Sequence, residues 1–214
     1  MKGKNLIIFG DSYSTYAGYI PEGYGPYYSG ERESEPDLES VEKTWWHMFV
    51  KQSGANLIRN DSWSGATIGY RGYNGEDYSK TSSFIYRLKK LRDEGFFDEN
   101  RIDTVIVFGG TNDSWCGAQI GEEMTEGWER EDLYRVLPAI WYFFKNLRAT
   151  LPNARICSIC NCDINEKIVD AISKVCRVIG ADVVKLKDID KIENHPTALG
   201  MVQIKDQVFD SFCK

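Results

Sequence analysis

Short apolar runs and amphipathic stretches alternate along the whole chain. Five apolar runs are separated by stretches in which apolar residues recur every three or four positions. The runs lie at 4–9, 55–60, 103–109, 154–160 and 181–186. Strands that alternate with helices in this way are typical of parallel sheets built by right-handed crossovers. The pattern therefore predicts an α/β fold, in which a five-stranded parallel sheet carries helices on both faces.

Two of the helical stretches contain residues that mark where a helix stops or starts. Residues 40–53 are predicted as a helix that ends at Gly54. Apolar side chains at helical spacing also fill residues 131–151, and Pro138 lies inside that stretch. Because proline lacks the backbone N–H that a helix interior needs, we expect the helix to kink or restart there.

Two further helices are predicted in the last third of the chain. Asp163 and Glu166 are three residues apart and resemble a capping box, opening a helix that ends at Gly180. A final helix is predicted over 197–212. Its expected apolar contacts are Leu199, Val202, Val208, Phe209 and Phe212.

Polar loops follow several of the predicted strands. The longest, at 13–44, contains Pro21, Pro26 and Pro36 and is predicted as a long loop or lid. Loops at 69–81 and 115–129 also follow strand ends and should crowd the same edge of the sheet. Since no internal repeat or linker interrupts the pattern, we expect one domain over 1–214.

The charge of the chain bears on its partners and its location. The 26 basic and 32 acidic residues give a net charge of −6, which argues against nucleic acid or an anionic membrane as a partner. The most basic stretch is 87–92. Phe84, Leu88 and Leu91 are spaced as on one face of a helix, so the charges of this stretch are predicted to lie on the solvated side of that helix. The first apolar run is too short for a signal-peptide core, which predicts a cytoplasmic location.

The six cysteines are expected to be free thiols rather than a metal or disulfide framework. They are Cys116, Cys157, Cys160, Cys162, Cys176 and Cys213. Cys157 and Cys160 fall in a predicted strand, where residues three apart point to opposite faces. No second pair at ligand spacing completes a metal site, so no metal is expected.

Polar clusters directly follow the first and third apolar runs. Ser12 comes after the run at 4–9, Asn112 comes after the run at 103–109, and His195 stands near the carboxyl end of the chain. Because the carboxyl ends of parallel strands meet at one edge of a sheet, we expect these side chains to lie together. A hydroxyl, an imidazole and a carboxamide are the groups that acyl transfer requires, so ester hydrolysis is the leading interpretation.

Each of these groups has a chemical task in such a reaction. The Ser12 hydroxyl would attack the ester carbonyl while a base, His195, removes its proton. The negative charge on the carbonyl oxygen needs hydrogen-bond donors. The candidates are the backbone N–H groups of Ser12 and Gly65 and the side-chain amide of Asn112. Structural roles are the alternative for each residue, as a helix cap for Ser12 or an Asx turn for Asn112. Asp113 is expected to hold its loop.

These clusters resemble the SGNH, or GDSL-like, hydrolase family. The matching blocks are Gly10-Asp11-Ser12-Tyr13-Ser14, Asn60-Asp61-Ser62-Trp63-Ser64-Gly65-Ala66, Gly109-Gly110-Thr111-Asn112-Asp113, and His195-Pro196 with Gly200. The blocks stand in the family's order and cover nearly the whole chain. The resemblance implies a flavodoxin-like three-layer α/β/α sandwich and ester hydrolysis without a metal or cofactor. It also implies that Ser12 is the nucleophile, His195 the base, and Gly65 and Asn112 the remaining oxyanion-hole residues.

One position departs from the family pattern. The family places an aspartate three residues before its histidine, and this chain has Ile192 there. The group that orients the imidazole could be Glu193, Asp190 or a backbone carbonyl, and the last would make the site a Ser–His dyad. The departure also raises an alternative, a catalytically idle member of the family that binds a carbohydrate or protein ligand.

Aromatic residues are frequent in the loops expected at this edge. Flat aromatic faces suit sugar rings, and they serve equally to hold long loops on a domain. Trp63, Tyr16 and Trp115 are the candidates for substrate contacts. We therefore expect a serine esterase that hydrolyses a short-chain acyl ester, such as an acetate, of a carbohydrate or another small polar alcohol. Flavin binding is disfavoured because the loop after the first run lacks a phosphate-cradling turn rich in serine and threonine.

Overall fold

Five parallel strands form the centre of the molecule. The strands are β1 (Asn5–Gly10), β2 (Asn56–Ser62), β3 (Thr104–Phe108), β4 (Arg155–Cys160) and β5 (Asp182–Lys185). The computed structural model describes residues 1–30 and 38–212, and its main sheet has the order β2-β1-β3-β4-β5. Every neighbouring pair in this sheet is parallel. This order and direction confirm the predicted five-stranded, flavodoxin-like sheet.

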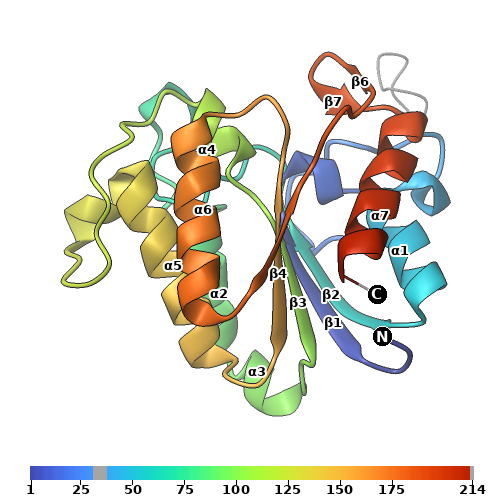
Figure 1. Cartoon of the computed structure of the whole chain (residues 1–214), viewed down its shortest axis with the longest axis horizontal. Helices are drawn as coiled ribbons and strands as arrows, with labels where there is room; N and C mark the ends of the chain where they lie inside the picture. The colour runs from blue at the N-terminus through green and yellow to red at the C-terminus, as the bar shows by residue number, and fades with distance from the viewer. Residues whose placement is uncertain (31–37, 213–214) are drawn as a thin grey trace.

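Helices cover both faces of this sheet. They are α1 (Trp45–Ser53), α2 (Phe84–Asp93), α3 (Phe96–Glu99), α4 (Thr111–Trp115), α5 (Val136–Thr150), α6 (Glu166–Ile179) and α7 (Ala198–Phe212). In Figure 1, α2, α5 and α6 lie on one face, while α1 and α7 lie on the other. The predicted three-layer α/β/α sandwich is therefore confirmed.

Two clusters of buried apolar side chains fill the spaces between the layers. Ile7 and Phe9 point into the cluster beneath α2, α5 and α6, whereas Leu6 and Ile8 point into the cluster beneath α1 and α7. This alternation follows from the two-residue period of a strand, and because both faces of β1 are buried its sequence is continuously apolar.

Local sequence accounts for several helix ends. The Thr44 side chain accepts a hydrogen bond from the backbone N–H of His47 at the start of α1, and Gly54 ends that helix with a positive φ of 68°. The stretch at 131–151 is split into a short 3-10 helix, η4 (Arg130–Tyr134), and α5. Pro138 lies in the first turn of α5, where a missing N–H breaks no helical hydrogen bond. The predicted restart is confirmed.

Two predictions about helix residues are wrong. The side chain that caps α6 belongs to Asn165, which accepts from the backbone N–H of Lys167, whereas Asp163 has a φ of 64° and lies before the helix. On α7, Leu199 and Val202 are 58% and 37% exposed. The helix instead buries Met201, Ile204, Val208 and Phe212. Its buried face is thus offset from the predicted one at the amino-terminal end.

The predicted lid at 13–44 includes residues 31–37, which lie outside the described residues. Its described part contains two 3-10 helices, η1 (Ser12–Ser14) and η2 (Val41–Lys43). The loop at 69–81 contains one more, η3 (Tyr73–Gly75). A lid function and the single-domain organisation over 1–214 stay predictions.

Cys157 and Cys160 point into opposite core clusters, as predicted. Burial raises the pKa of the Cys160 thiol to about 12, so it is a neutral core side chain. Over residues 1–30 and 38–212, no group of three or more His, Cys, Asp or Glu side chains could hold a metal ion. Among the helices in that part of the chain, none combines the length and apolarity needed to cross a membrane. The cytoplasmic location stays a prediction.

Candidate active site

The carboxyl end of β1 leads directly into the turn that carries Ser12. The Asp11 side chain accepts a hydrogen bond of 3.1 Å from the backbone N–H of Tyr13 and so caps η1. Gly10 must be glycine here, because a Cβ atom would lie 2.4 Å from the Ser62 Oγ of β2. The strand end and its neighbour are therefore closely packed, and the Ser12 turn rests on the core.

His195 lies on a small hairpin that the sequence patterns did not predict. The hairpin pairs β6 (Lys191–Ile192) with β7 (His195–Pro196) through a two-residue turn. Its turn residues, Glu193 and Asn194, have φ values of 47° and 65°, as a type I′ turn requires. In Figure 1 the hairpin lies at the edge of the molecule where the carboxyl ends of the sheet strands point.

The hairpin brings His195 to Ser12. The Nε2 atom of His195 is 3.0 Å from Ser12 Oγ, and its Nδ1 atom is 3.2 Å from the backbone carbonyl oxygen of Glu193. A carbonyl can only accept a hydrogen bond, so Nδ1 carries the proton and Nε2 is free to accept one from the Ser12 hydroxyl. The arrangement is that of a nucleophile beside a base.

Of the three groups considered for orienting the imidazole, the backbone carbonyl of Glu193 is the one in contact. The carboxylate of Asp190 instead accepts a hydrogen bond from the Thr197 hydroxyl, and the Asp190 backbone N–H donates to Gln203 Oε1 at 2.7 Å. Asp190 therefore fastens the start of α7. The predicted orienting role of its carboxylate has no geometric support.

Burial lowers the pKa of the His195 imidazole below its ordinary value. The hydrogen bond to the Glu193 carbonyl and the negative charge of Glu193 act in the opposite direction, while the positive charge of Lys191 adds to the lowering. At neutral pH the ring is therefore uncharged, which is the form that a general base requires.

Three tyrosines from the segment after β1 hold the hairpin in place. The Tyr13 hydroxyl donates to the backbone carbonyl of Asn194, and the Tyr28 hydroxyl donates to the carbonyl of Pro196 at 3.1 Å. The ring of Tyr27 stacks on the imidazole, with 3.5 Å between centroids and 7° between planes. Nothing in the sequence patterns linked these tyrosines to His195, because the contacts span most of the chain.

Asn112 occupies the first turn of α4 and is held at both ends of its carboxamide. Its Nδ2 donates to the carbonyl of Ala66 at 2.9 Å, and its Oδ1 accepts from the Tyr73 hydroxyl at 2.8 Å. Because an amide nitrogen carries two hydrogens, one N–H remains to serve a ligand. Sequence reasoning missed Tyr73, which orients this side chain from η3.

The loop that contains Gly65 is fixed by Asp113, the residue after Asn112. The Asp113 carboxylate accepts from the backbone N–H groups of Ile68, at 2.9 Å, and Gly69, at 3.3 Å. Gly65 has a φ of 76°, and the space where a Cβ would stand is open. Burial raises the pKa of Asp113 to about 6 and that of Asp11 to about 7. The expectation that Asp113 holds its loop agrees with these contacts.

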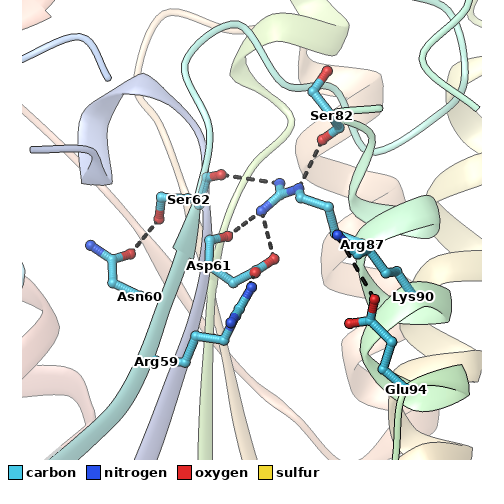
Figure 2. Close-up of polar contacts among 9 residues, drawn as sticks. Arg59, Asn60, Asp61, Ser62, Ser82, Arg87, Lys90 and Glu94 are labelled. Carbon is cyan, nitrogen blue, oxygen red and sulfur yellow. Dashed lines mark hydrogen bonds and ion pairs between the residues drawn. The ribbon is translucent and has the colours of Figure 1, made fainter. Parts of the chain in front are cut away.

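A buried guanidinium lies under the two turns. Lys89 and Arg92 of the stretch at 87–92 are exposed as predicted, whereas the prediction is wrong for Arg87. Arg87 is fully buried and forms an ion pair of 3.0 Å with Asp61 Oδ2. It also donates to the backbone carbonyls of Asp61, Ser82 (2.8 Å) and Gly10 (3.2 Å). Figure 2 shows the guanidinium between Asp61 and Ser82. Arg87 thereby joins the end of β1, the end of β2 and the start of α2.

The three predicted substrate contacts have different surroundings. Trp63 is half-buried and stacks on Tyr24, with 4.3 Å between ring centroids, beside a cavity of about 240 Å³. Trp115 is also half-buried. Tyr16 is only 7% exposed and packs in the core cluster beneath α1 and α7. Its ring supports the fold rather than a surface that a ligand could reach.

Comparison with known proteins gives one family. A family model described as GDSL-like lipase/acylhydrolase matches residues 4–212. A solved structure assigned as a GDSL-like lipase from Bacteroides uniformis ATCC 8492 is 40% identical, with a TM-score of 0.90, and the match covers 99% of this chain and 96% of that chain. Another, from Bacteroides ovatus ATCC 8483, is 38% identical, with a TM-score of 0.88 and 97% of each chain covered. No curated protein matches.

A more distant structure shares the fold alone. It is an acetyl xylan esterase from the rumen bacterium Butyrivibrio proteoclasticus, 19% identical with a TM-score of 0.61, and the match covers 98% of this chain and 63% of that chain. The family model, in contrast, spans nearly the whole sequence, and the resemblance inferred from the four motif blocks is confirmed. The chain belongs to the GDSL-like lipase/acylhydrolase family and is a carboxylic ester hydrolase.

Proposed function

We propose that the protein is a serine esterase in which Ser12 is the nucleophile and His195 the general base. The observation that carries the proposal is the 3.0 Å separation between Ser12 Oγ and His195 Nε2, with Nδ1 occupied by the Glu193 carbonyl. That geometry fits a Ser–His dyad, in which a carbonyl takes the place of the usual carboxylate.

The reaction proceeds through an acyl-serine intermediate. The Ser12 proton passes to His195 Nε2 as Oγ bonds to the acyl carbon, and the carbonyl electron pair moves onto its oxygen. The backbone N–H groups of Ser12 and Gly65 and the second N–H of Asn112 Nδ2 stabilise that oxyanion. The C–O bond to the alcohol then breaks, and the imidazolium returns its proton to the leaving oxygen. In the second half, His195 takes a proton from water, the hydroxide attacks the acyl carbon, and the acid leaves as Ser12 regains its proton.

The substrate that we propose is a short-chain acyl ester, such as an acetate, of a carbohydrate or another small polar alcohol. Trp63 supports this class. Its backbone N–H donates to the Gly10 carbonyl at 3.1 Å, which holds it close to the turn that carries Ser12. Its indole lies beside a cavity that Lys80 and Thr81 also line. An aromatic ring among polar side chains suits a sugar. The shared fold of the acetyl xylan esterase is consistent with the proposal.

The first test is hydrolysis of 4-nitrophenyl acetate by wild type and by Ser12→Ala. We expect the enzymatic rate to fall by at least roughly 10³-fold, because the attacking oxygen is gone. Ser173→Ala is the matched control, since this hydroxyl bonds within α6 at Val169 and should leave the rate unchanged. Equal rates from wild type and Ser12→Ala would refute the nucleophile.

A second test separates an esterase from an idle binding protein. An organophosphonate should form a bond between its phosphorus and Ser12 Oγ and lose its leaving group, so mass spectrometry should find one adduct on the Ser12 peptide. Binding of acetylated sugars without such labelling would favour the idle alternative. A comparison of acetate, butyrate and octanoate esters then tests the preference for short acyl groups.

A further inference from the structure

The ring that covers His195 belongs to Tyr27, which comes from the nucleophile side of the site. The Tyr27 ring and the imidazole are nearly parallel, with 7° between their planes and 3.5 Å between their centroids. The backbone N–H of Tyr27 donates to Thr15 Oγ1 at 2.8 Å, and that hydroxyl donates to the carbonyl of Ser12 at 2.9 Å. Two hydrogen bonds therefore tie the residue that covers the base to the turn that carries the nucleophile.

Within residues 1–30 and 38–212, the partner of the imidazole at Nδ1 is a carbonyl rather than a carboxylate. The groups that face it are the Glu193 carbonyl at Nδ1, the Ser12 hydroxyl at Nε2, and the rings of Tyr13, Tyr27 and Tyr28. Two charged side chains of the hairpin act on it at longer range. Lys191 lowers the pKa of the ring and Glu193 raises it. The Lys191 ammonium is itself held by Asn161 at 3.1 Å and by Asp163 at 3.4 Å.

An aromatic face can supply part of what the missing carboxylate would supply. The face of a phenol ring is electron-rich and attracts a cation that lies over it. An imidazolium stacked on Tyr27 is therefore stabilised more than the neutral imidazole, and the stacked plane keeps Nε2 aimed at Ser12. The first effect grows as the proton moves from Ser12 to His195, whereas the second is present throughout.

We propose that Tyr27 is a positioning residue, which holds the plane of His195 and stabilises its protonated form in place of an acid. The proposal rests on the esterase function proposed above, because it assumes that His195 accepts a proton during turnover. It adds a residue that the GDSL-like motif blocks do not contain.

The test compares Tyr27→Leu with Tyr27→Phe. Leucine keeps an apolar cover over the imidazole but has no aromatic face, whereas phenylalanine keeps the face. For Tyr27→Leu we expect kcat/KM on 4-nitrophenyl acetate to fall by roughly threefold to thirtyfold, the range expected for one cation–π contact. The acid limb of the pH profile should move to lower pH by roughly half a unit to one and a half units, because the imidazolium loses its support. Tyr27→Phe should keep both values close to wild type.

An NMR titration reads the same change without any turnover. The chain has only two histidines, His47 and His195, so a His47→Gln variant assigns their imidazole signals. In Tyr27→Leu the His195 signal should titrate at lower pH than in wild type, while the His47 signal should not move. Tyr19→Leu is the matched control, since this tyrosine lies on the same segment, is 52% exposed and has its ring 6.3 Å from that of Trp46, tilted by 49°.

Several results would overturn the proposal. These are a Tyr27→Leu variant with wild-type rate and titration, a loss of rate with the His195 pKa unchanged or higher, and a Tyr27→Phe variant as impaired as Tyr27→Leu. If Tyr27→Leu does not fold, judged by circular dichroism, Tyr27→Met carries the same comparison. Failure of the esterase proposal itself would be seen separately, as undiminished activity in Ser12→Ala.

Discussion

The two halves of the candidate site are held by different kinds of contact. The Ser12 half is the end of a central strand, and the fully buried Arg87 and Asp61 lie beneath it. The His195 half is a hairpin of two-residue strands, held by tyrosine hydroxyls and one stacked ring. Ser12, the proposed nucleophile, thus lies on contacts shared with the centre of the fold, whereas His195, the proposed base, is held by a small number of contacts at the edge of the sheet. Activity and stability should therefore separate according to the half that is changed.

The largest expected effect is on the His195 half. We expect His195→Asn to lower kcat/KM by roughly 10²- to 10⁴-fold, since the proposed general base is lost. The free energy of unfolding should fall by about 0.5 to 1.5 kcal/mol for each ring contact with Tyr13, Tyr27 or Tyr28 that is lost. Ester hydrolysis and urea unfolding of the same preparation measure the two quantities. A variant that unfolds globally would show that the hairpin belongs to the core after all.

The next effect is on the Ser12 half and is one of stability. Arg87→Met removes one of the two ion pairs that the described residues form with the buried Asp61 carboxylate and leaves the one with Arg59, 2.8 Å away. Breaking a buried ion pair on one side costs about 3–5 kcal/mol, and urea unfolding should show that loss. The double variant R87M/D61N should recover part of it, because the buried carboxylate is removed together with the guanidinium. Wild-type stability in Arg87→Met would contradict the anchoring role of Arg87.

The smallest effect is a pH dependence of stability in the Ser12 half. Burial raises the pKa of Asp11 from 3.8 to about 7, so the folded state holds a proton that the unfolded state releases at lower pH. This contribution is complete below pH 3.8 and is lost as the pH rises through about 7. Relative to Asp11→Asn, wild type should therefore lose about 2 to 3 kcal/mol of stability between pH 5 and pH 8. Urea unfolding at the two pH values checks the sign, and a difference that does not change with pH would refute it.

The sequence predicts the Ser12 half better than the His195 half, for physical reasons. A strand buried on both faces has a continuous apolar run, and the turn that follows it has a short local motif. Arg87 was misjudged although it lies three residues after Phe84 and four before Leu91, on the buried face of α2. Its long side chain and charge outweighed that spacing in the prediction.

The His195 hairpin had no comparable signal. Two-residue strands are too short to show alternation. Both turn residues have a positive φ, but only Asn194 is a residue type that favours it, since Glu193 gives no such signal. The contacts that hold it join residues about 170 to 180 positions apart, such as Tyr13 with Asn194 and Tyr28 with Pro196. The resemblance of the His195-Pro196 block to the family motif placed His195 near Ser12, and nothing local indicated Tyr27 as its cover.

The Glu193 carbonyl gives the proposed site a different charge balance from that of a serine triad. A carbonyl is a dipole without net charge, so proton transfer creates one cation on His195 and one anion on the tetrahedral intermediate, and the two neutralise each other. Among the described residues, the group in contact with Nδ1 is an uncharged carbonyl, and the Glu193 carboxylate acts on the ring only at longer range. An ester that carries its own carboxylate or phosphate would therefore meet less electrostatic repulsion there than in a site where a carboxylate contacts Nδ1.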